Sequence, residues 1–277
     1  MPGSDSKETF LVVFSDLDGS LLDHHTYSYA PARPALEALK KRGVPLVLCS
    51  SKTRAEMEGL WEGLGLDAPF IAENGAALFA PPGCEPPPDQ GWQADDPGWR
   101  VLTLGRPVSE VRRTFARFKD RFLARGFGDL DDLEVAVLTG LSPDEASRAR
   151  RREYNEPVLL PEPESQGPEF CRAAREAGLE VTRGGRFFHL LAGGDKGRAV
   201  RRLSDMYRRR HPGLVTMALG DAPNDRSMLA EVDHPVLLAK SDGSHAEVDL
   251  PGLERQPLAG PEGWKEAVLA FLRRYQR

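Results

Sequence analysis

FLVVFSDLDGS, residues 10–20, begins with apolar and β-branched side chains and ends in two carboxylates beside a glycine. The first six residues are typical of a strand that is buried on both faces, as in the middle of a parallel sheet. Asp16 and Asp18 therefore follow the carboxyl end of a strand, where open parallel sheets bind their ligands. Gly19 permits a tight turn and the close approach of a ligand. Ordinary strand-end turn residues remain the alternative interpretation of the two aspartates.

Strand and helix patterns alternate outward from this stretch and resume late in the chain. Apolar runs predict strands at residues 44–49, 215–219 and 236–239. Amphipathic patterns predict a helix from Arg33, a helix that follows Ser50–Thr53 and ends at Gly65, and helices around 196–207, 228–229 and 264–272. Residues 70–72 and 76–79 predict a hairpin across Glu73-Asn74-Gly75. The order predicts an α/β fold, a doubly wound parallel-sheet (Rossmann-like) core.

The middle of the chain breaks this rhythm. Residues 81–98 are crowded with proline, glycine and aspartate, and the next hundred residues mix strand and helix signals without a repeated order. We therefore expect a discontinuous core formed by residues 1–83 and 190–277. An inserted α+β cap domain is expected at residues 84–189.

Three further polar clusters fall at or near predicted strand ends. Ser50-Ser51 would offer hydroxyl and backbone N–H donors to a phosphoryl group at a helix start, although a plain N-cap explains the same pattern. Lys196, at a glycine-flanked helix start, would bring a cation to a phosphate, or would simply be solvated. The stretch 220–225, GDAPND, supplies the oxygen ligands that Mg²⁺ prefers.

Taken together and in order, Asp-x-Asp, Ser, Lys and Gly-Asp-x-x-Asn-Asp resemble the haloacid-dehalogenase superfamily of phosphatases. The resemblance implies that Asp16 is the nucleophile and Asp18 the general acid and base. It also implies the remaining roles: Ser50, Ser51, Lys196 and Asn224 as phosphate-binding residues, Asp16, Asp18 (through its carbonyl) and Asp221 as Mg²⁺ ligands, and Asp225 as the residue that orients the metal shell.

Within that superfamily, SSKTRAEM at 50–57, ENGA at 73–76 and REYNEP at 152–157 resemble the mannosyl-3-phosphoglycerate phosphatases. This likeness implies hydrolysis of mannosyl-3-phosphoglycerate to mannosylglycerate, a compatible solute, with glucosyl phosphoglycerates or other sugar phosphates as alternative substrates. The substrate is then a small phosphorylated sugar-glycerate. The residues expected to read its sugar and carboxylate are Asn74, Arg152, Glu153, Tyr154 and Asn155.

The overall composition limits the classes of function. A net charge of -5 and the lack of a basic excess argue against a nucleic-acid partner. The polar start, residues 1–9, and the lack of a long apolar run argue against export or a membrane partner, and three scattered cysteines fit a reducing compartment, so a cytoplasmic location is expected. Abundant arginine and proline are typical of a thermophile or a GC-rich genome. The oligomeric state is not indicated.

Other functions fit parts of the pattern. A non-catalytic phosphoacceptor switch also places acidic groups at strand ends, but it needs neither Asp18 nor a large cap. A phosphomutase on the same core would return the phosphoryl group to a sugar, and steady release of phosphate would distinguish the two. A glycosyltransferase using Asp16 and Asp18 as metal ligands leaves Lys196 and the 220–225 stretch unexplained.

Overall fold

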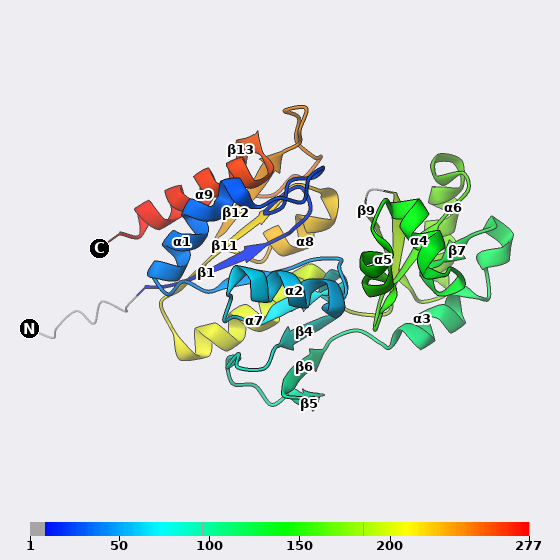
Figure 1. The fold of residues 1–277 in the computed structure, drawn as a ribbon, viewed down its shortest axis with the longest axis horizontal. Helices are drawn as coiled ribbons and strands as arrows, with labels where there is room; N and C mark the ends of the chain where they lie inside the picture. The colour runs from blue at the N-terminus through cyan, green and yellow to red at the C-terminus, as the bar shows by residue number, and fades with distance from the viewer. Residues whose placement is uncertain (1–8, 96, 185, 277) are drawn as a thin grey trace, which may run out of the picture.

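The computed structural model describes residues 9–95, 97–184 and 186–276, so most of the polar start lies outside the described residues. The chain forms two lobes (Figure 1). The larger, called the core lobe, contains both ends of the described chain, and the smaller, called the cap lobe, comprises Val108–Leu191. Across the described ranges, each helix is too short or too polar to cross a membrane.

The core lobe is built on a five-stranded parallel sheet. In spatial order its strands are β13 (Glu254–Ala259), β12 (His234–Ala239), β11 (Leu214–Gly220), β1 (Phe10–Ser15) and β2 (Leu46–Leu48). Strand β1 lies between β11 and β2, as its apolar sequence requires. The predicted doubly wound α/β core is confirmed.

Successive side chains of β1 enter two different apolar clusters. Leu11 and Val13 pack on the face covered by α1 (Arg33–Lys41), α2 (Arg54–Leu64) and α9 (Gly260–Arg274). Val12 and Phe14 pack on the face covered by α7 (Lys196–Arg210) and α8 (Arg226–Leu229). Because side chains alternate along a strand, a continuous apolar run fills both cores at once. The sheet edge that carries Asp16 is thereby held from both sides.

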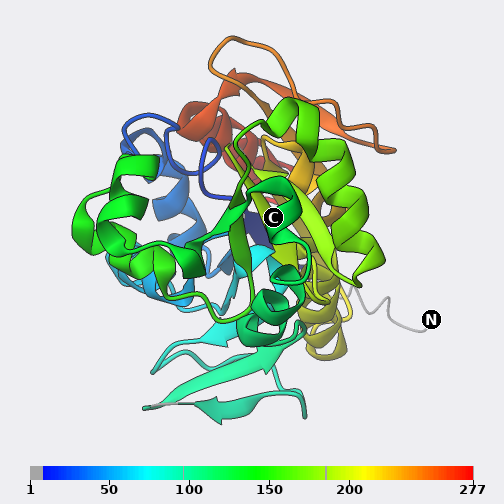
Figure 2. The ribbon, with the colours of Figure 1, turned by 90° about the vertical axis from the view of Figure 1, so that its right-hand side faces the viewer.

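A second, antiparallel sheet extends the core lobe. It consists of β3 (Phe70–Ala72), β4 (Ala77–Ala80), β6 (Trp99–Thr103) and β5 (Gln93–Asp95) in spatial order, and it projects below the core in Figure 2. The domain boundary at residue 84 stays a prediction. Since β5 and β6 pair with the β3–β4 hairpin and Trp99 joins the core cluster, we propose that the inserted unit begins later, near Gly105.

The cap lobe has its own antiparallel sheet and its own apolar clusters. The sheet order is β7 (Arg125–Gly126), β8 (Glu156–Leu159), β10 (Phe187–Leu191) and β9 (Glu180–Gly184). The helices are α3 (Val108–Phe115), α4 (Asp132–Thr139), α5 (Pro143–Arg150) and α6 (Pro163–Glu176). Figure 2 shows this lobe in front of the core sheet, on the side where the chain crosses between lobes.

Candidate active site

The carboxyl ends of β1, β2 and β11 bring the predicted clusters together. Lys196 is the centre of the arrangement: its Nζ lies 2.6 Å from the Asp16 carboxylate and 2.7 Å from the Asp225 carboxylate. The Lys196 side chain is 2% exposed, so its interpretation as a solvated helix start is wrong. The helix instead begins at the N-cap Asp195, whose carboxylate accepts the backbone N–H groups of Gly197 and Arg198.

Asp225 organises the loop after β11. It is fully buried, and its second oxygen accepts the backbone N–H groups of Asp221 and Ala222, each at 3.1 Å. Both carboxylate oxygens of Asp225 are therefore engaged with the protein. The expected role of Asp225, which is to orient the metal shell, stays a prediction, and its engaged oxygens favour that role over direct metal ligation. Asn224 lies half-buried in the same turn, where the turn-residue interpretation also remains.

The cluster concentrates negative charge in a buried place. Burial and the nearby Asp225 raise the pKa of Asp221 to about 7. Burial likewise raises the pKa of Asp16. The nearby Asp225 raises this pKa further, and Lys196 only partly offsets the two effects. Burial alone would lower the pKa of Lys196, but the two carboxylates outweigh it and hold the ammonium protonated. A further cation bound at this place would favour the ionised forms of Asp16 and Asp221.

The carboxylates of Asp16, Asp221 and Asp225 have ligand atoms within 4.8 Å of one another. Because Asp225 is committed to Lys196 and two amides, Asp16 and Asp221 are the members left to bind a cation. Gly19 has a φ of +81°, and a Cβ there would lie 2.4 Å from Asp221 Oδ2. Hard oxygen donors around a tight glycine turn fit a Mg²⁺ ion.

Ser50 and Ser51 do not start a helix. Helix α2 begins at Arg54, with Thr53 as the N-cap in a capping box with Glu56, so the expected helix start at the serines and their interpretation as an N-cap are both wrong. Their role as phosphate-binding residues stays a prediction. Ser50 instead lies two residues after the end of β2, where it is buried and its hydroxyl accepts the N–H of Lys52 at 3.2 Å. The Ser51 carbonyl accepts a hydrogen bond from the side chain of Arg152 in the cap lobe.

Asp18 has a partner that the sequence did not reveal. Lys52 Nζ lies 3.0 Å from Asp18 Oδ2, with the Lys52 side chain 20% exposed. The other oxygen, Oδ1, is buried and has no hydrogen-bond partner within the described part of the chain. Lys52 thus fixes the carboxyl group and leaves one oxygen for another molecule. Lys52 stands directly after the two serines in the sequence, but no local pattern there indicates its contact with Asp18.

The turn after β3 supplies another residue without its full set of partners. Asn74 is 3% exposed, and within the described residues neither its side-chain oxygen nor its nitrogen has a hydrogen-bond partner. Its backbone N–H donates to the Ser50 carbonyl at 2.9 Å, which fixes it beside the end of β2. A buried amide without partners is costly, so Asn74 is a strong candidate to bind a ligand.

The cap segment 152–156 reaches the core lobe. The Arg152 side chain is 6% exposed, and it donates to the carbonyls of Ala149 and Ser51. Glu153 pairs with Arg54 at 3.0 Å. The Tyr154 hydroxyl lies 3.1 Å from that of Thr103. These three residues therefore join the lobes in this structure.

Asn155 differs from its neighbours. It is fully buried, its Oδ1 lies 3.1 Å from Nδ1 of the buried His189, and its Nδ2 finds no partner in the ranges that the structure describes. Burial lowers the pKa of His189 to about 3, with Arg152 and Lys196 adding to the effect, so the imidazole is neutral near pH 7. Asn155 and Asn74 thus both present unsatisfied amide groups, as residues facing a polar substrate would.

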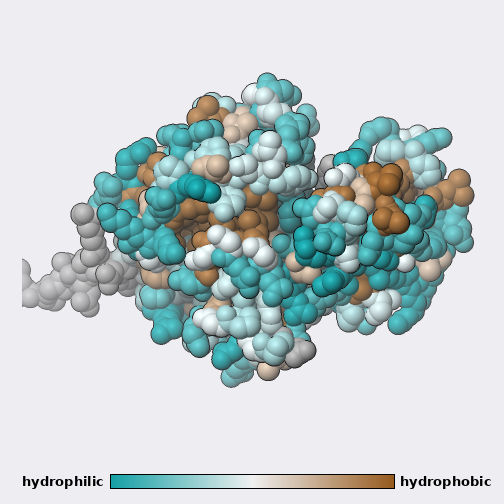
Figure 3. Space-filling view, in the orientation of Figure 1, coloured by the Kyte–Doolittle hydropathy of each residue, from teal (hydrophilic) through white to brown (hydrophobic). Residues whose placement is uncertain are grey.

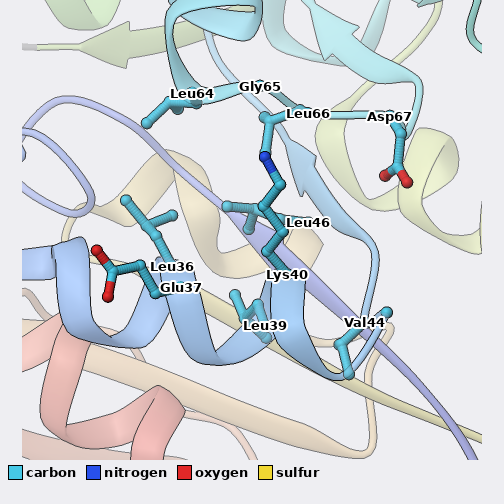
Figure 4. Close-up of a pocket in the computed structure, with 11 residues that line it drawn as sticks. Leu36, Glu37, Leu39, Lys40, Val44, Leu46, Leu64, Gly65, Leu66 and Asp67 are labelled. Carbon is cyan, nitrogen blue, oxygen red and sulfur yellow. The ribbon is translucent and has the colours of Figure 1, made fainter.

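Two other surface features lie apart from these motifs. A cavity of about 260 Å³ opens between α1 and the end of α2, lined by residues such as Leu36, Lys40 and Leu66 (Figure 4). Leu133 and Val137 of α4 are exposed, and Figure 3 shows apolar surface on the cap lobe. Neither feature includes a residue of the four motifs, so the candidate site is the cluster at the strand ends.

Comparison with known proteins agrees with this geometry. Residues 13–82 match the model of the haloacid dehalogenase-like hydrolase family. The chain is 38% identical over 272 residues to a glucosyl-3-phosphoglycerate/mannosyl-3-phosphoglycerate phosphatase of Persephonella marina, covering 96% of this chain and 99% of that one. It is 40% identical over 268 residues to a protein of the same name from Methanococcoides burtonii, covering 94% and 97%. The resemblance inferred from the motifs is confirmed.

Solved structures share the fold at lower identity. A sugar phosphatase of haloacid dehalogenase subclass IIB superposes with a TM-score of 0.63 at 19% identity, over 94% of this chain and 98% of that one. A protein of Thermoplasma acidophilum gives a TM-score of 0.66 at 18% identity, over 96% and 99%. Both lobes are therefore shared with proteins of known structure.

Proposed function

Since the chain belongs to the haloacid dehalogenase-like hydrolases, we propose that it is a Mg²⁺-dependent phosphatase that hydrolyses mannosyl-3-phosphoglycerate or its glucosyl counterpart. The observation that carries the proposal is the likeness to the two relatives over almost the whole chain, cap lobe included. In a two-lobed site, the motifs at the strand ends perform the phosphate chemistry, and the second lobe selects the organic part of the substrate. Likeness across both lobes therefore bears on the substrate as well as the reaction.

In the proposed first step an Asp16 oxygen attacks phosphorus, an Asp16–phosphate bond forms, and the bond from phosphorus to the glycerate oxygen breaks. Lys196, 2.6 Å from Asp16, holds the nucleophile in place and balances charge. Asp18 Oδ1, left free by the Lys52 contact, donates a proton to the departing glycerate oxygen.

In the second step, water attacks the same phosphorus atom. Asp18 accepts the proton of that water, phosphate leaves, and the Asp16 carboxylate is restored. A Mg²⁺ ion bound by Asp16, Asp221 and the Asp18 carbonyl would neutralise charge between the phosphate and the nucleophile. Ser50, Ser51 and Asn224 are the proposed donors to the phosphoryl oxygens.

The two unsatisfied amides, Asn74 and Asn155, are the proposed contacts for the sugar hydroxyls or the carboxylate. An amide offers both donors and acceptors, which suits hydroxyl groups that require both. Arg152, Glu153 and Tyr154 shape the wall of the site through their contacts with the core lobe. The substrate is then enclosed between the lobes, away from bulk water.

Phosphate release from both sugar phosphoglycerates and a panel of hexose phosphates, with and without Mg²⁺, tests the proposal. The wild-type chain should prefer the phosphoglycerates, and chelation or Asp16→Asn should abolish release. Preference for another panel member would overturn the substrate while leaving the reaction. Stable phosphate on Asp16 with no turnover of any substrate would identify a phosphoacceptor switch instead.

A further inference from the structure

Glu73 occupies a strained and fully buried position between the two lobes. It is 0% exposed, and its φ is 49°, followed by 59° at Asn74. Two successive non-glycine residues in the left-handed region are uncommon, and the conformation is unfavourable above all for Glu73, since asparagine adopts it more readily. Such strain persists only where surrounding contacts offset it. The contacts of Glu73 therefore indicate what this turn does.

The backbone of the turn is fixed to the phosphate-handling side of the site. The Glu73 N–H donates to the Lys52 carbonyl at 3.0 Å, and the Asn74 N–H donates to the Ser50 carbonyl at 2.9 Å. Gly75 packs so closely that a Cβ there would lie 2.2 Å from the Asp195 carbonyl carbon and 2.5 Å from the backbone nitrogen of Lys196. The turn is thus held against the segments that carry Ser50 and Lys196.

The Glu73 side chain points the other way, into the cap lobe. Its carboxylate accepts three consecutive backbone N–H groups, from Glu153 at 2.8 Å, Tyr154 at 3.0 Å and Asn155 at 2.7 Å. Successive N–H groups that converge on one point form an anion-binding nest. Burial raises the pKa of the Glu73 carboxyl, while Arg152 and the three amides oppose this and favour the ionised acceptor.

The lobes are joined by two adjacent crossings that are rich in glycine. The Arg106 N–H donates to the Ala192 carbonyl at 2.7 Å, which holds the crossings side by side. Gly105 lies on one crossing, and Gly193 and Gly194, both with positive φ, lie on the other. Rotation of the cap lobe about these crossings would break all three Glu73 bonds together, because their donors belong to one short segment.

We propose that Glu73 is a positioning residue that latches the cap segment 153–155 onto the core lobe, so that Asn155 is placed over the site only when the lobes are closed. The kinetic part of this inference rests on the proposed function, since it assumes that the cap lobe binds the organic part of the substrate. Asn74, the next residue, remains the direct contact. Glu73 itself acts through the segment it holds.

Amide hydrogen exchange on the full chain tests the latch without any substrate. In Glu73→Gln and Glu73→Ala, the amides of residues 153–155 should exchange about tenfold faster or more, the loss expected for bonds to a charged acceptor. Amides of β10 (Phe187–Leu191), internal to the cap lobe, should keep their protection. Unchanged exchange at 153–155 would overturn the latch, as would loss of protection throughout the cap lobe.

Kinetics separate a latch from general damage. The variants should lose about tenfold in kcat/KM on the sugar phosphoglycerate but retain activity on p-nitrophenyl phosphate, which has no sugar or glycerate to be read. Asp233→Asn is the control for the loss of a carboxylate that accepts a backbone N–H, because Asp233 accepts the N–H and hydroxyl of Thr216 within the core lobe. Equal losses on both substrates would contradict the latch. If the wild-type chain hydrolyses neither ester, the proposed function fails, and the exchange result still decides the latch.

Discussion

The ammonium of Lys196 lies 2.6 Å from the carboxylate of Asp16, and the lysine side chain is almost completely excluded from solvent. The same ammonium lies 2.7 Å from Asp225. One cation therefore holds together two carboxylates from distant segments of the chain. Asp16 follows β1, and Asp225, 209 residues later, lies in the loop after β11. Removal of this cation would leave those charges buried without a partner.

Lys196→Met should accordingly abolish phosphate release and destabilise the fold by about 3–5 kcal/mol in the presence of a chelator. Added Mg²⁺ should raise Tm more in this variant than in wild type, because the metal then replaces part of the missing charge. Thermal unfolding with EDTA and with Mg²⁺ measures both effects. Lys265→Met, which breaks only surface contacts with Glu262 and Glu266, should leave Tm nearly unchanged. An equal Mg²⁺ effect in Lys196→Met and wild type would contradict the charge argument.

Gly19 and Gly243 offer a matched test of the metal site. Both have a φ of +81°, but a Cβ at Gly19 would lie 2.4 Å from Asp221 Oδ2, whereas a Cβ at Gly243 meets no described atom within 4 Å. Each substitution by alanine should cost about 1–2 kcal/mol through backbone strain. Only Gly19→Ala should also displace Asp221 and reduce phosphate release strongly. Urea unfolding and initial rates measure the two effects, and equal activity in the two variants would refute the proposed contact.

Asp221→Asn should change stability in opposite directions with and without metal. Burial and Asp225 raise the pKa of Asp221 to about 7, so at pH 8 the carboxylate is mostly ionised but its charge destabilises the folded state relative to the unfolded one. Replacing it with a neutral amide should stabilise the metal-free chain, by up to about 4 kcal/mol on the order-of-magnitude scale of such a pKa change. The same change should weaken the rise in Tm on adding Mg²⁺. A metal-free variant less stable than wild type at pH 8 would count against this charge balance.

The motifs at the strand ends could be predicted because their signals are local. The apolar run before Asp16 defines β1, and Val215–Leu219 similarly leads to Gly220 and Asp221. Parallel strands deliver such ends to one edge, so sequence order alone predicts that they meet. The structure brings Asp16, Asp221 and Asp225 within 4.8 Å of one another, as this reasoning requires.

Other features depend on contacts that sequence does not display. Strand β13, Glu254–Ala259, was missed because it is largely exposed and contains Pro257, a residue that argues against a strand. The proline is tolerated there because β13 lies at the edge of the sheet, where it removes no bond of a central ladder. The Asp18–Lys52 pair joins two loops, and Glu73 finds its three donors 80 to 82 positions later. Side chains that act across lobes leave no periodic pattern. They appear only once the lobes are placed together.

His189 predicts a specific loss of stability in mild acid. Burial, with Arg152 and Lys196, lowers its pKa to about 3 in the folded chain, against about 6.5 when unfolded. The neutral ring is therefore favoured by folding, and its contribution is complete above pH 6.5. As the pH falls below 6.5, the unfolded state binds a proton that the folded state excludes, so stability decreases, by about 1.4 kcal/mol at pH 5.5 relative to pH 8.

His189→Gln removes this titration while its amide can still donate to Asn155 Oδ1, the partner that lies 3.1 Å from Nδ1 of the histidine. The other histidines are common to both chains, so the difference between wild type and variant isolates the one group. Urea unfolding at pH 8 and pH 5.5 should show a pH dependence smaller by about 1.4 kcal/mol in the variant. The same pH dependence in both chains would mean that His189 is charged in the folded state, and that the wall beside Asn155 carries a positive charge rather than a neutral ring.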